Sequence, residues 1–299
     1  MSDLQYTDHT GAFVRCGRTV KTLDPGFYDV KRTLSGWGLA GRVPSSDELI
    51  DIPGTVADEI FADIDSFIAG VFRYSLFRLT HKRGYLLYGP PGSGKTSLGL
   101  MLASRFIRKG GGIVMYVGSA TEFIEGIGIM RDVEPGRPSM YLIEEADDIV
   151  DNTTCLSILD GELSIQGAVF VAMTNYKDRL PPRIANRPGR FDRVTLVDCP
   201  PPAVQAEYLR RIFARDPDAT VTRGRATPED IVAALLGLPM SMAHLREAFI
   251  SHVLMELPLE EVRARFEKMA GNLAPEAKET SSDSDADCPG TCDECYEPC

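Results

Sequence analysis

The 299 residues of the chain are 43% hydrophobic and 25% charged, an ordinary globular composition with material for one large domain and a small one. No apolar run approaches the roughly 18 residues of a membrane-spanning helix, and the polar start of the chain shows no signal peptide, so we expect a reducing compartment with free thiols. The net charge is −11, of which residues 272–299 contribute −7, with eight acids and one base. The near-neutral body disfavours nucleic-acid binding without excluding a local basic surface.

The first 46 residues carry Gly and Pro at short intervals. This predicts short strands and loops, and we assign this N-terminal region no role. From Thr55 to Val71, apolar residues recur at helical spacing with acids on the opposite face, so we expect an amphipathic helix there. This helix would lie near the start of the next domain, which we place at residues 47–199.

Five short apolar runs follow, each typical of a strand that is buried on both faces. They are Tyr85–Tyr88, Ile113–Val117, Met140–Ile143, Ala168–Met173 and Val194–Val197. Helical patterns separate most of the runs, and strands that alternate with helices form parallel sheets with right-handed crossovers. Residues 47–199 are therefore predicted to form an α/β domain with a parallel five-stranded sheet flanked by helices.

Strand patterns stop after Pro200, and amphipathic helical patterns continue to about Gly271. The segment Thr227–Asp230 is typical of a helix start, with a hydroxyl cap, a proline at the first helical position and an acid three residues on. Ser241 is a second candidate cap. We therefore expect a small all-helical domain over 200–271. Ser, Asp, Glu and Pro dominate residues 272–299, which predicts a disordered acidic tail.

The segment that joins the first of these strands to its helix is rich in glycine. Its members are Gly89, Pro90, Pro91, Gly92, Ser93, Gly94, Lys95, Thr96 and Ser97. A strand, this pattern and a helix together are typical of a phosphate-binding loop, because the glycines turn backbone N–H groups toward phosphate oxygens at a helix N-terminus. We expect Lys95 to reach the β- and γ-phosphates of ATP and the Thr96 hydroxyl to ligate Mg²⁺. The match in this context disfavours a plain glycine-rich turn.

Polar side chains follow two later strands. Glu144 and Glu145 come directly after Met140–Ile143. Carboxylates in such a place hold Mg²⁺ through water and polarise the attacking water, and we assign the metal to Glu144 and the water to Glu145. Asn175 follows Ala168–Met173 and could hold the water or the γ-phosphate. A solvated acidic turn and an ordinary turn asparagine are the alternatives, which the order of the motifs disfavours.

Arginine residues are dense in the turn formed by residues 186–193. Arginine suits developing phosphoryl charge because its guanidinium group is planar, permanently charged and bidentate. Taken alone, Arg187 and Arg190 would be expected in surface salt bridges. With the loop and the acids upstream, we predict that both are fingers that reach ATP bound to a neighbouring copy.

These motifs together resemble the AAA family of ATPases, over about residues 51–271. The loop resembles the Walker A motif of the family, and Tyr141–Glu145 its Walker B motif. Thr174-Asn175 is similar to sensor 1, and the arginine turn to the arginine-finger segment. Asp51-Ile52-Pro53-Gly54 resembles the segment that packs near adenine through backbone atoms, which adds Ile52 and Gly54 to the expected nucleotide contacts.

The resemblance implies a P-loop NTPase fold in which residues 200–271 form a helical lid. It also implies ATP and Mg²⁺ as cofactors and a homo-oligomeric ring, usually of six subunits. Within the family, Lys82–Gly92 is most similar to the ATPases that assemble mitochondrial respiratory complex III, whose rings have seven subunits. Soluble relatives of those proteins occur in bacteria and phages, so we expect a cytoplasmic protein without a membrane partner, encoded by a bacterium or phage.

Two features depart from the family pattern. Glu144 stands where most members have aspartate. In addition, no aromatic–hydrophobic–glycine pore loop follows the helix after the second strand, which argues against threading of unfolded polypeptide.

Four of the seven cysteines gather at the C-terminus, namely Cys288, Cys292, Cys295 and Cys299. Four thiolates could hold Zn²⁺. The usual pair of C-x₂-C knuckles with a long insert is absent, however, and no apolar residues surround the cluster. The pattern therefore favours a redox-sensitive or simply disordered tail over a zinc site.

The motif set predicts an ATP-hydrolysing ring motor that remodels a macromolecular client. A protein client is favoured by the resemblance. A nucleic-acid machine, such as a replication or packaging accessory, is an alternative that the near-neutral body disfavours. A nucleotide-gated scaffold with negligible hydrolysis is a third hypothesis, motivated by Glu144 in place of aspartate.

Overall fold

The computed structural model describes residues 5–9, 12–16, 20–33, 36–44, 49–146, 152–161, 166–177, 180 and 189–272. For residues 5–16 and 270–272 this description covers the backbone alone. Within these ranges, no helix combines the length and the hydropathy that a bilayer crossing requires.

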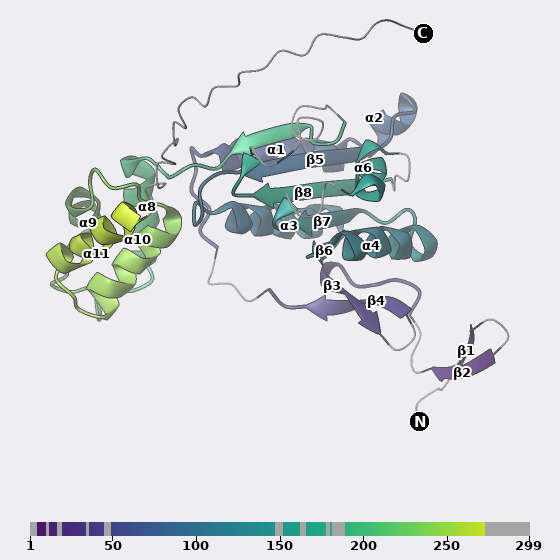
Figure 1. Ribbon diagram of the computed structural model, residues 1–299, viewed down its shortest axis with the longest axis horizontal. Coiled ribbons are helices and arrows are strands. Elements are labelled where there is room, and N and C mark those ends of the chain that lie inside the picture. Colours follow the sequence, from purple (N-terminus) through teal and green to yellow (C-terminus); the bar gives the residue numbers. More distant parts are fainter. Residues whose placement is uncertain are drawn as a thin grey trace, which may run out of the picture.

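A seven-stranded sheet forms the centre of the large domain (Figure 1). Its strands lie in the order β4-β3-β6-β7-β8-β5-β9. Their bounds are β3 Gly26–Thr33, β4 Gly36–Arg42, β5 Lys82–Tyr88, β6 Ile113–Val117, β7 Ser139–Ile143, β8 Ala168–Thr174 and β9 Arg193–Leu196. All neighbours pair in parallel except β3 and β4, which form an antiparallel hairpin. The predicted α/β class and its five parallel strands are confirmed.

The number of strands is larger than the predicted five, because β3 and β4 extend the sheet beyond β6. Both strands come from the N-terminal region to which the sequence assigned no role. Of the two, only Val30 is a buried residue, since an edge hairpin is covered on fewer sides than a central strand. Their sequences therefore lack the continuous apolar run that marks a buried parallel strand. Strands β1 (Gln5–His9) and β2 (Ala12–Cys16) form a separate antiparallel pair.

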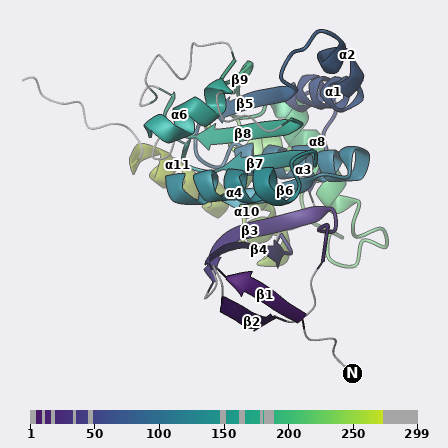
Figure 2. The ribbon, with the colours of Figure 1, turned by 90° about the vertical axis from the view of Figure 1, so that its right-hand side faces the viewer.

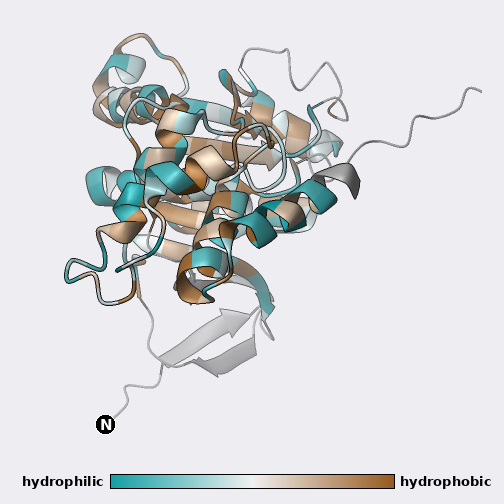
Figure 3. Cartoon of the chain, turned by 90° about the vertical axis from the view of Figure 1, so that its left-hand side faces the viewer, coloured by the Kyte–Doolittle hydropathy of each residue, from teal (hydrophilic) through white to brown (hydrophobic). Residues whose placement is uncertain are grey.

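Helices cover both faces of the sheet (Figure 2). Helices α1 (Val56–Ala69) and α3 (Lys95–Gly110) pack on one face, and α4 (Ala120–Val133) and α6 (Thr153–Asp160) on the other. Alternate residues of β7 enter the two cores, Met140 facing α1 and α3 and Tyr141 facing α4 and α6. Burial on both faces explains why the sequences of the central strands are unbroken apolar runs. In Figure 3 these strands are coloured brown, whereas the helices in front of them carry both hydrophilic and hydrophobic residues.

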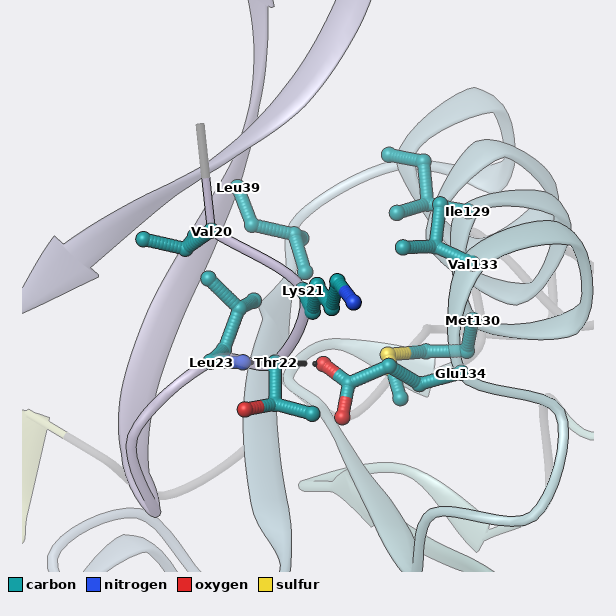
Figure 4. Close-up of a pocket in the computed structure, with 9 residues that line it drawn as sticks. All are labelled: Val20, Lys21, Thr22, Leu23, Leu39, Ile129, Met130, Val133 and Glu134. Carbon is teal, nitrogen blue, oxygen red and sulfur yellow. Dashed lines mark hydrogen bonds between the residues drawn. The ribbon is translucent and has the colours of Figure 1, made fainter. Parts of the chain in front are cut away.

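The chain before β3 is held to the end of α4 by hydrogen bonds between backbone and side-chain atoms, and Figure 4 shows the bond between Leu23 and Glu134. The Leu23 N–H donates to Glu134 Oε1 at 3.0 Å, and Arg137 Nη2 donates to the Leu23 carbonyl at 3.2 Å. A small apolar cavity lies between the two segments, lined by Leu39, Met130 and their neighbours. The contact fixes the edge hairpin to the rest of the domain.

The second domain is all helical and lies at one end of the sheet (Figure 1). It contains α8 (Pro202–Phe213), α9 (Pro228–Ala234), α10 (Met242–Phe249), the π-helix η2 (Ile250–Leu254) and α11 (Leu259–Asn272). The predicted caps are confirmed: Thr227 forms a capping box with Asp230, and Ser241 forms one with His244. A core of its own, which includes Leu209, holds the helices together. Below, this unit is called the lid.

Candidate functional site: a phosphate loop between the sheet and the lid

The phosphate loop leaves the carboxyl end of β5 and leads into α3. Gly89 has φ 152°, and a Cβ there would lie 2.1 Å from the carbonyl oxygen of Val197. Only glycine therefore allows the loop to pass so close to the chain after β9. Gly92 and Gly94 also have positive φ, at 73° and 104°. Helix α3 starts at Lys95, so the free N–H groups of its first turn adjoin the loop.

The Lys95 side chain lies inside this loop. Its Nζ donates to the carbonyl oxygens of Gly89 and Pro90, at 2.9 Å each, and the residue is 8% exposed. Burial lowers the pKa of Lys95, and a phosphate group within reach of the ammonium would raise it again. Ser93 contributes a buried hydroxyl oxygen that has no hydrogen-bond partner in the described part of the chain. The loop thus presents a cation, N–H donors and an unsatisfied hydroxyl, which fit a polyphosphate.

The predicted acids and amide lie at the same edge of the sheet as the loop. Strands β7, β8 and β5 are neighbours, with Ile143 paired to Ala172 and Thr174 paired to Tyr88. Glu144 and Asn175 follow those strand ends directly. The register therefore brings the ends of three strands together, as expected for a ligand site at the carboxyl edge of a parallel sheet.

The polar side chains expected to meet a nucleotide are exposed at this edge. Thr96, Glu144, Glu145 and Asn175 all have exposed side chains. Hydroxyl and carboxylate oxygens are ligands that suit Mg²⁺, so Thr96 and Glu144 fit the metal role predicted for them. Glu145 adopts φ 50°, a left-handed conformation that costs of order 1–3 kcal/mol for a residue other than glycine. Such strain is typical of functional positions.

The lid touches the phosphate loop directly, a contact that the sequence did not predict. The Ala243 N–H at the start of α10 donates to the Gly92 carbonyl at 3.1 Å. A Cβ at Gly92 would lie 2.9 Å from both the Ala243 Cβ and the Ser241 Oγ. Gly92 therefore serves two purposes, loop curvature and close approach of the lid. Ser241 was recognised only as a helix cap, and no local pattern indicates what the capped end contacts.

The segment expected near adenine joins the large domain to the lid. Ile52 is buried, and its carbonyl accepts from Thr55 Oγ1 at 3.1 Å. Gly54 has φ 78°, and its N–H donates to Asp58 Oδ2 at 2.6 Å. Arg211 of α8 donates to the Asp51 carbonyl. The segment is therefore fixed both to the start of α1 and to the lid.

Residues 189–193 of the arginine turn lie at the opposite end of β5. Arg190 is 5% exposed and makes a bidentate ion pair with Asp160, both N···O distances being 2.7 Å. This pairing within one chain was not predicted, because Asp160 ends α6 and is distant in sequence. Arg187, the other expected finger, lies outside the described residues.

Several further bonds hold the residues after Arg187 to the start of β5. Lys82 Nζ donates to the Gly189 carbonyl at 2.8 Å and also to the carbonyl of Leu159. The N–H of Gly84 donates to Asp192 Oδ2 at 2.9 Å. Gly84 is required here, since a Cβ would lie 2.0 Å from the Arg190 carbonyl oxygen. Sequence reasoning missed this role of Lys82, which no motif marks.

Residues 273–299, which include the terminal cysteines and nearly all of the predicted tail, lie outside the described residues. Within the described part of the chain, no three His, Cys, Asp or Glu side chains gather as a metal site would require. Cys155 and Cys199 are free thiols there.

The α/β fold and the phosphate loop at the carboxyl edge of its sheet define a P-loop nucleoside triphosphatase domain with a helical lid. A family model described as "ATPase family associated with various cellular activities (AAA)" matches residues 85–199. Residues 85–199 are therefore similar to the ATPase domain of that family.

Curated relatives share this region. The chain is 33% identical over 190 residues to ATP-dependent zinc metalloprotease FtsH 3 of Sphaerobacter thermophilus, a match that covers 56% of this chain and 37% of that protein. It is 30% identical over 200 residues to FtsH 1 of Symbiobacterium thermophilum, covering 58% and 32%. It is 28% identical over 236 residues to FtsH of Rhodococcus erythropolis, covering 70% and 26%. The chain thus spans about a third of the length of these relatives or less.

Proposed function

We propose that the chain is a ring-forming motor that hydrolyses Mg·ATP at the interfaces between its copies and remodels a protein client. One observation carries the proposal. The sheet register brings Lys95, the Glu144–Glu145 pair and Asn175 to one edge, beneath a lid that contacts the phosphate loop.

Each side chain has a part in the proposed reaction. Lys95 neutralises charge on the β- and γ-phosphates. The Thr96 hydroxyl and Glu144 would hold Mg²⁺, which would stabilise the phosphoryl charge. Glu145 accepts the proton of the attacking water, and Asn175 orients that water or the γ-phosphate. The backbone of Ile52 and Gly54 lines the adenine side.

A neighbouring copy completes the site in this proposal. Arg187 of that copy supplies the positive charge that the transition state needs. For Arg190 the buried pair with Asp160 favours a holding role, in which the pair fixes the turn that carries Arg187. Both arginines remain necessary, one by touching the phosphate and the other by positioning.

Two observations favour a protein as the client. The relatives are named as ATP-dependent proteases, which act on proteins, and the near-neutral body gives no general attraction for nucleic acid. The segment Lys82–Gly92 supports a finer kinship, with soluble relatives of the complex III assembly ATPases. Ring size, six or seven, follows from whichever kinship holds.

The test is the ATPase rate per subunit against protein concentration, for wild type and Arg187→Ala. We expect a rate that rises cooperatively with concentration in the wild type and stays low in the variant. A wild-type rate that is independent of concentration would contradict a shared site.

Wild-type turnover should also exceed that of Glu145→Gln by about 100-fold or more, because the general base is lost. Equal rates would favour the nucleotide-gated scaffold instead. The exposed Asp132→Asn is the matched control, since its carboxylate is 71% exposed and distant in sequence from the strand ends.

A further inference from the structure

Arg42 ends strand β4, and one residue each of β3 and β6 holds its side chain in place. Its Nη1 donates to Asp29 Oδ1 at 2.8 Å, and its guanidinium carbon lies 3.7 Å from the centre of the Tyr116 ring. Phe27 packs against the same ring, with 6.0 Å between the ring centroids. An ion pair and a stacking contact together fix both the position and the plane of a guanidinium group. Arg42 is therefore a cation at a fixed place, and the proposed reaction assigns it no part.

The register of the sheet places this cation beside the carboxyl edge. Asp29 pairs with Tyr116, and Tyr116 pairs with Leu142, so the three residues form one row across β3, β6 and β7. Residues in such a row point to the same face of the sheet, and Tyr116 and Leu142 both pack toward α1 and α3. Side chains alternate along a strand, so Glu144, two residues after Leu142, continues that face just beyond the end of β7.

The electrostatic effects on both side chains agree with this placement. The hydrogen bond to Asp29 raises the pKa of Arg42, and the negative charge of Glu144 adds to the increase. Burial raises the pKa of Tyr116, and the charge of Glu144 again acts in the same direction. Such effects weaken with distance and are screened by solvent. The Glu144 carboxylate therefore lies near both the guanidinium group and the phenol ring.

Glu144 has the reach and the freedom to respond to this cation. Its side chain is exposed, and it is a methylene group longer than the aspartate that most AAA ATPases have at this position. The additional rotatable bond lets the carboxylate occupy more positions than that of an aspartate could. A carboxylate with this freedom can turn either toward Mg²⁺ or toward Arg42.

We propose that Arg42 is a positioning residue that competes with Mg²⁺ for the Glu144 carboxylate. While the site holds no metal, Arg42 draws the carboxylate toward β6 and balances its charge. Arg42 releases the carboxylate when Mg²⁺ is bound with ATP. This inference rests on the proposed function, which gives Glu144 the metal role. It also gives the hairpin of β3 and β4 a part in the chemistry, since both Asp29 and Arg42 come from it.

The competition affects nucleotide binding differently with and without the metal. The phosphates of metal-free ATP are repelled by Glu144, and Arg42 reduces this repulsion. Bound Mg²⁺ is attracted by Glu144, and Arg42 reduces this attraction. Loss of the Arg42 charge should therefore weaken the binding of metal-free nucleotide and increase the gain in affinity that Mg²⁺ provides. A hairpin that is merely loosened would leave that gain unchanged.

The experiment titrates the full chain with a fluorescent, non-hydrolysable ATP analogue, once with Mg²⁺ and once with EDTA. The ratio of the two dissociation constants, EDTA over Mg²⁺, measures the gain from the metal. We expect Arg42→Gln to increase this ratio by about threefold or more, and Arg42→Lys to stay near the wild-type ratio because the charge is kept. Arg32→Gln is the matched control, since Arg32 is an exposed residue of the same hairpin on the opposite face of β3 from Asp29. Circular dichroism would verify that all variants fold.

A double-mutant cycle tests whether Arg42 acts through Glu144. In a Glu144→Gln background there is no carboxylate charge to compete for, so Arg42→Gln should change the ratio by less than about 1.5-fold. An unchanged or decreased ratio for Arg42→Gln alone, or an increase that persists with Glu144→Gln, would overturn the proposal and leave the ring motor intact. A wild type that binds the analogue equally with and without Mg²⁺ would overturn the metal role of Glu144, and the proposed function with it.

Discussion

Polar groups lie at both ends of strand β5, and the two ends differ in how far these groups are exposed to solvent. At the carboxyl end, Thr96, Glu144 and Asn175 are exposed to solvent. At the amino end, Arg190 is 5% exposed and bound to Asp160, and Lys82 is bound to two carbonyl groups. Lys95 at the carboxyl end is also buried and bound to two carbonyl groups, but the other polar groups named there are exposed and can accept a ligand. The groups at the amino end satisfy one another and fix the backbone. The first end is therefore a binding edge and the second a holding edge.

The distinction between the two edges requires that ATP hydrolysis depends on the binding edge. Lys95→Ala should lower the ATPase rate per subunit by about 100-fold or more, because a charge that opposes the phosphates is lost. Lys109→Ala is the matched control on the same helix, where Lys109 pairs with Asp65 at the protein surface. A Lys95→Ala rate within about twofold of the wild-type rate would place the chemistry elsewhere.

At the holding edge the effect should appear in stability. Arg190→Ala leaves the Asp160 carboxylate without its bidentate partner in a mostly buried place, which should reduce the free energy of unfolding by about 2–4 kcal/mol. Urea denaturation measures this loss, and Arg131→Ala at an exposed ion pair should change it by less than about 0.5 kcal/mol. A change in ATP affinity without a loss of stability would contradict the distinction between the two edges.

The contact of the lid with the binding edge can be separated from backbone strain by two glycines. Gly92 and Gly111 both have positive φ, but only at Gly92 would a Cβ meet the lid. Gly111→Ala should cost about 1 kcal/mol of stability and leave ATP affinity unchanged. Gly92→Ala should in addition weaken ATP binding by about tenfold, as measured by fluorescent-nucleotide titration. Equal affinities in the two variants would remove the lid from the site.

The smallest effect concerns an ion pair outside both edges. The hydrogen bond from Arg105 lowers the pKa of Asp65 to about 2. A lowered carboxyl pKa contributes stability above the unfolded value of about 3.9, and this contribution is lost as the pH falls toward 2. Asp65→Asn should thus cost about 1–2 kcal/mol at pH 7 and almost nothing near pH 2. Denaturant unfolding at both pH values measures the difference, and a cost independent of pH would contradict the ion-pair explanation.

The sequence predicted features that a local pattern marks, and it did not predict contacts between distant segments. The phosphate loop is a continuous motif between a strand and a helix, so local pattern suffices to find it. The five central strands are recognisable because both faces are buried. By contrast, β3 and β4 were not expected to join the sheet, since only Val30 among them is a buried residue. The pairs Asp160–Arg190 and Gly92–Ala243 join residues that are far apart in sequence, and no local pattern encodes such a pairing.

The central claim, a site shared between copies, is tested most directly by mixing two inactive variants. Arg187→Ala has an intact binding edge and lacks the finger, while Lys95→Ala has the finger and lacks the binding edge. We predict that the mixture regains a substantial fraction of the wild-type ATPase rate, because each Arg187→Ala site can receive Arg187 from a Lys95→Ala neighbour. A mixture no more active than the sum of the two separate variants would contradict a site completed by the neighbouring copy.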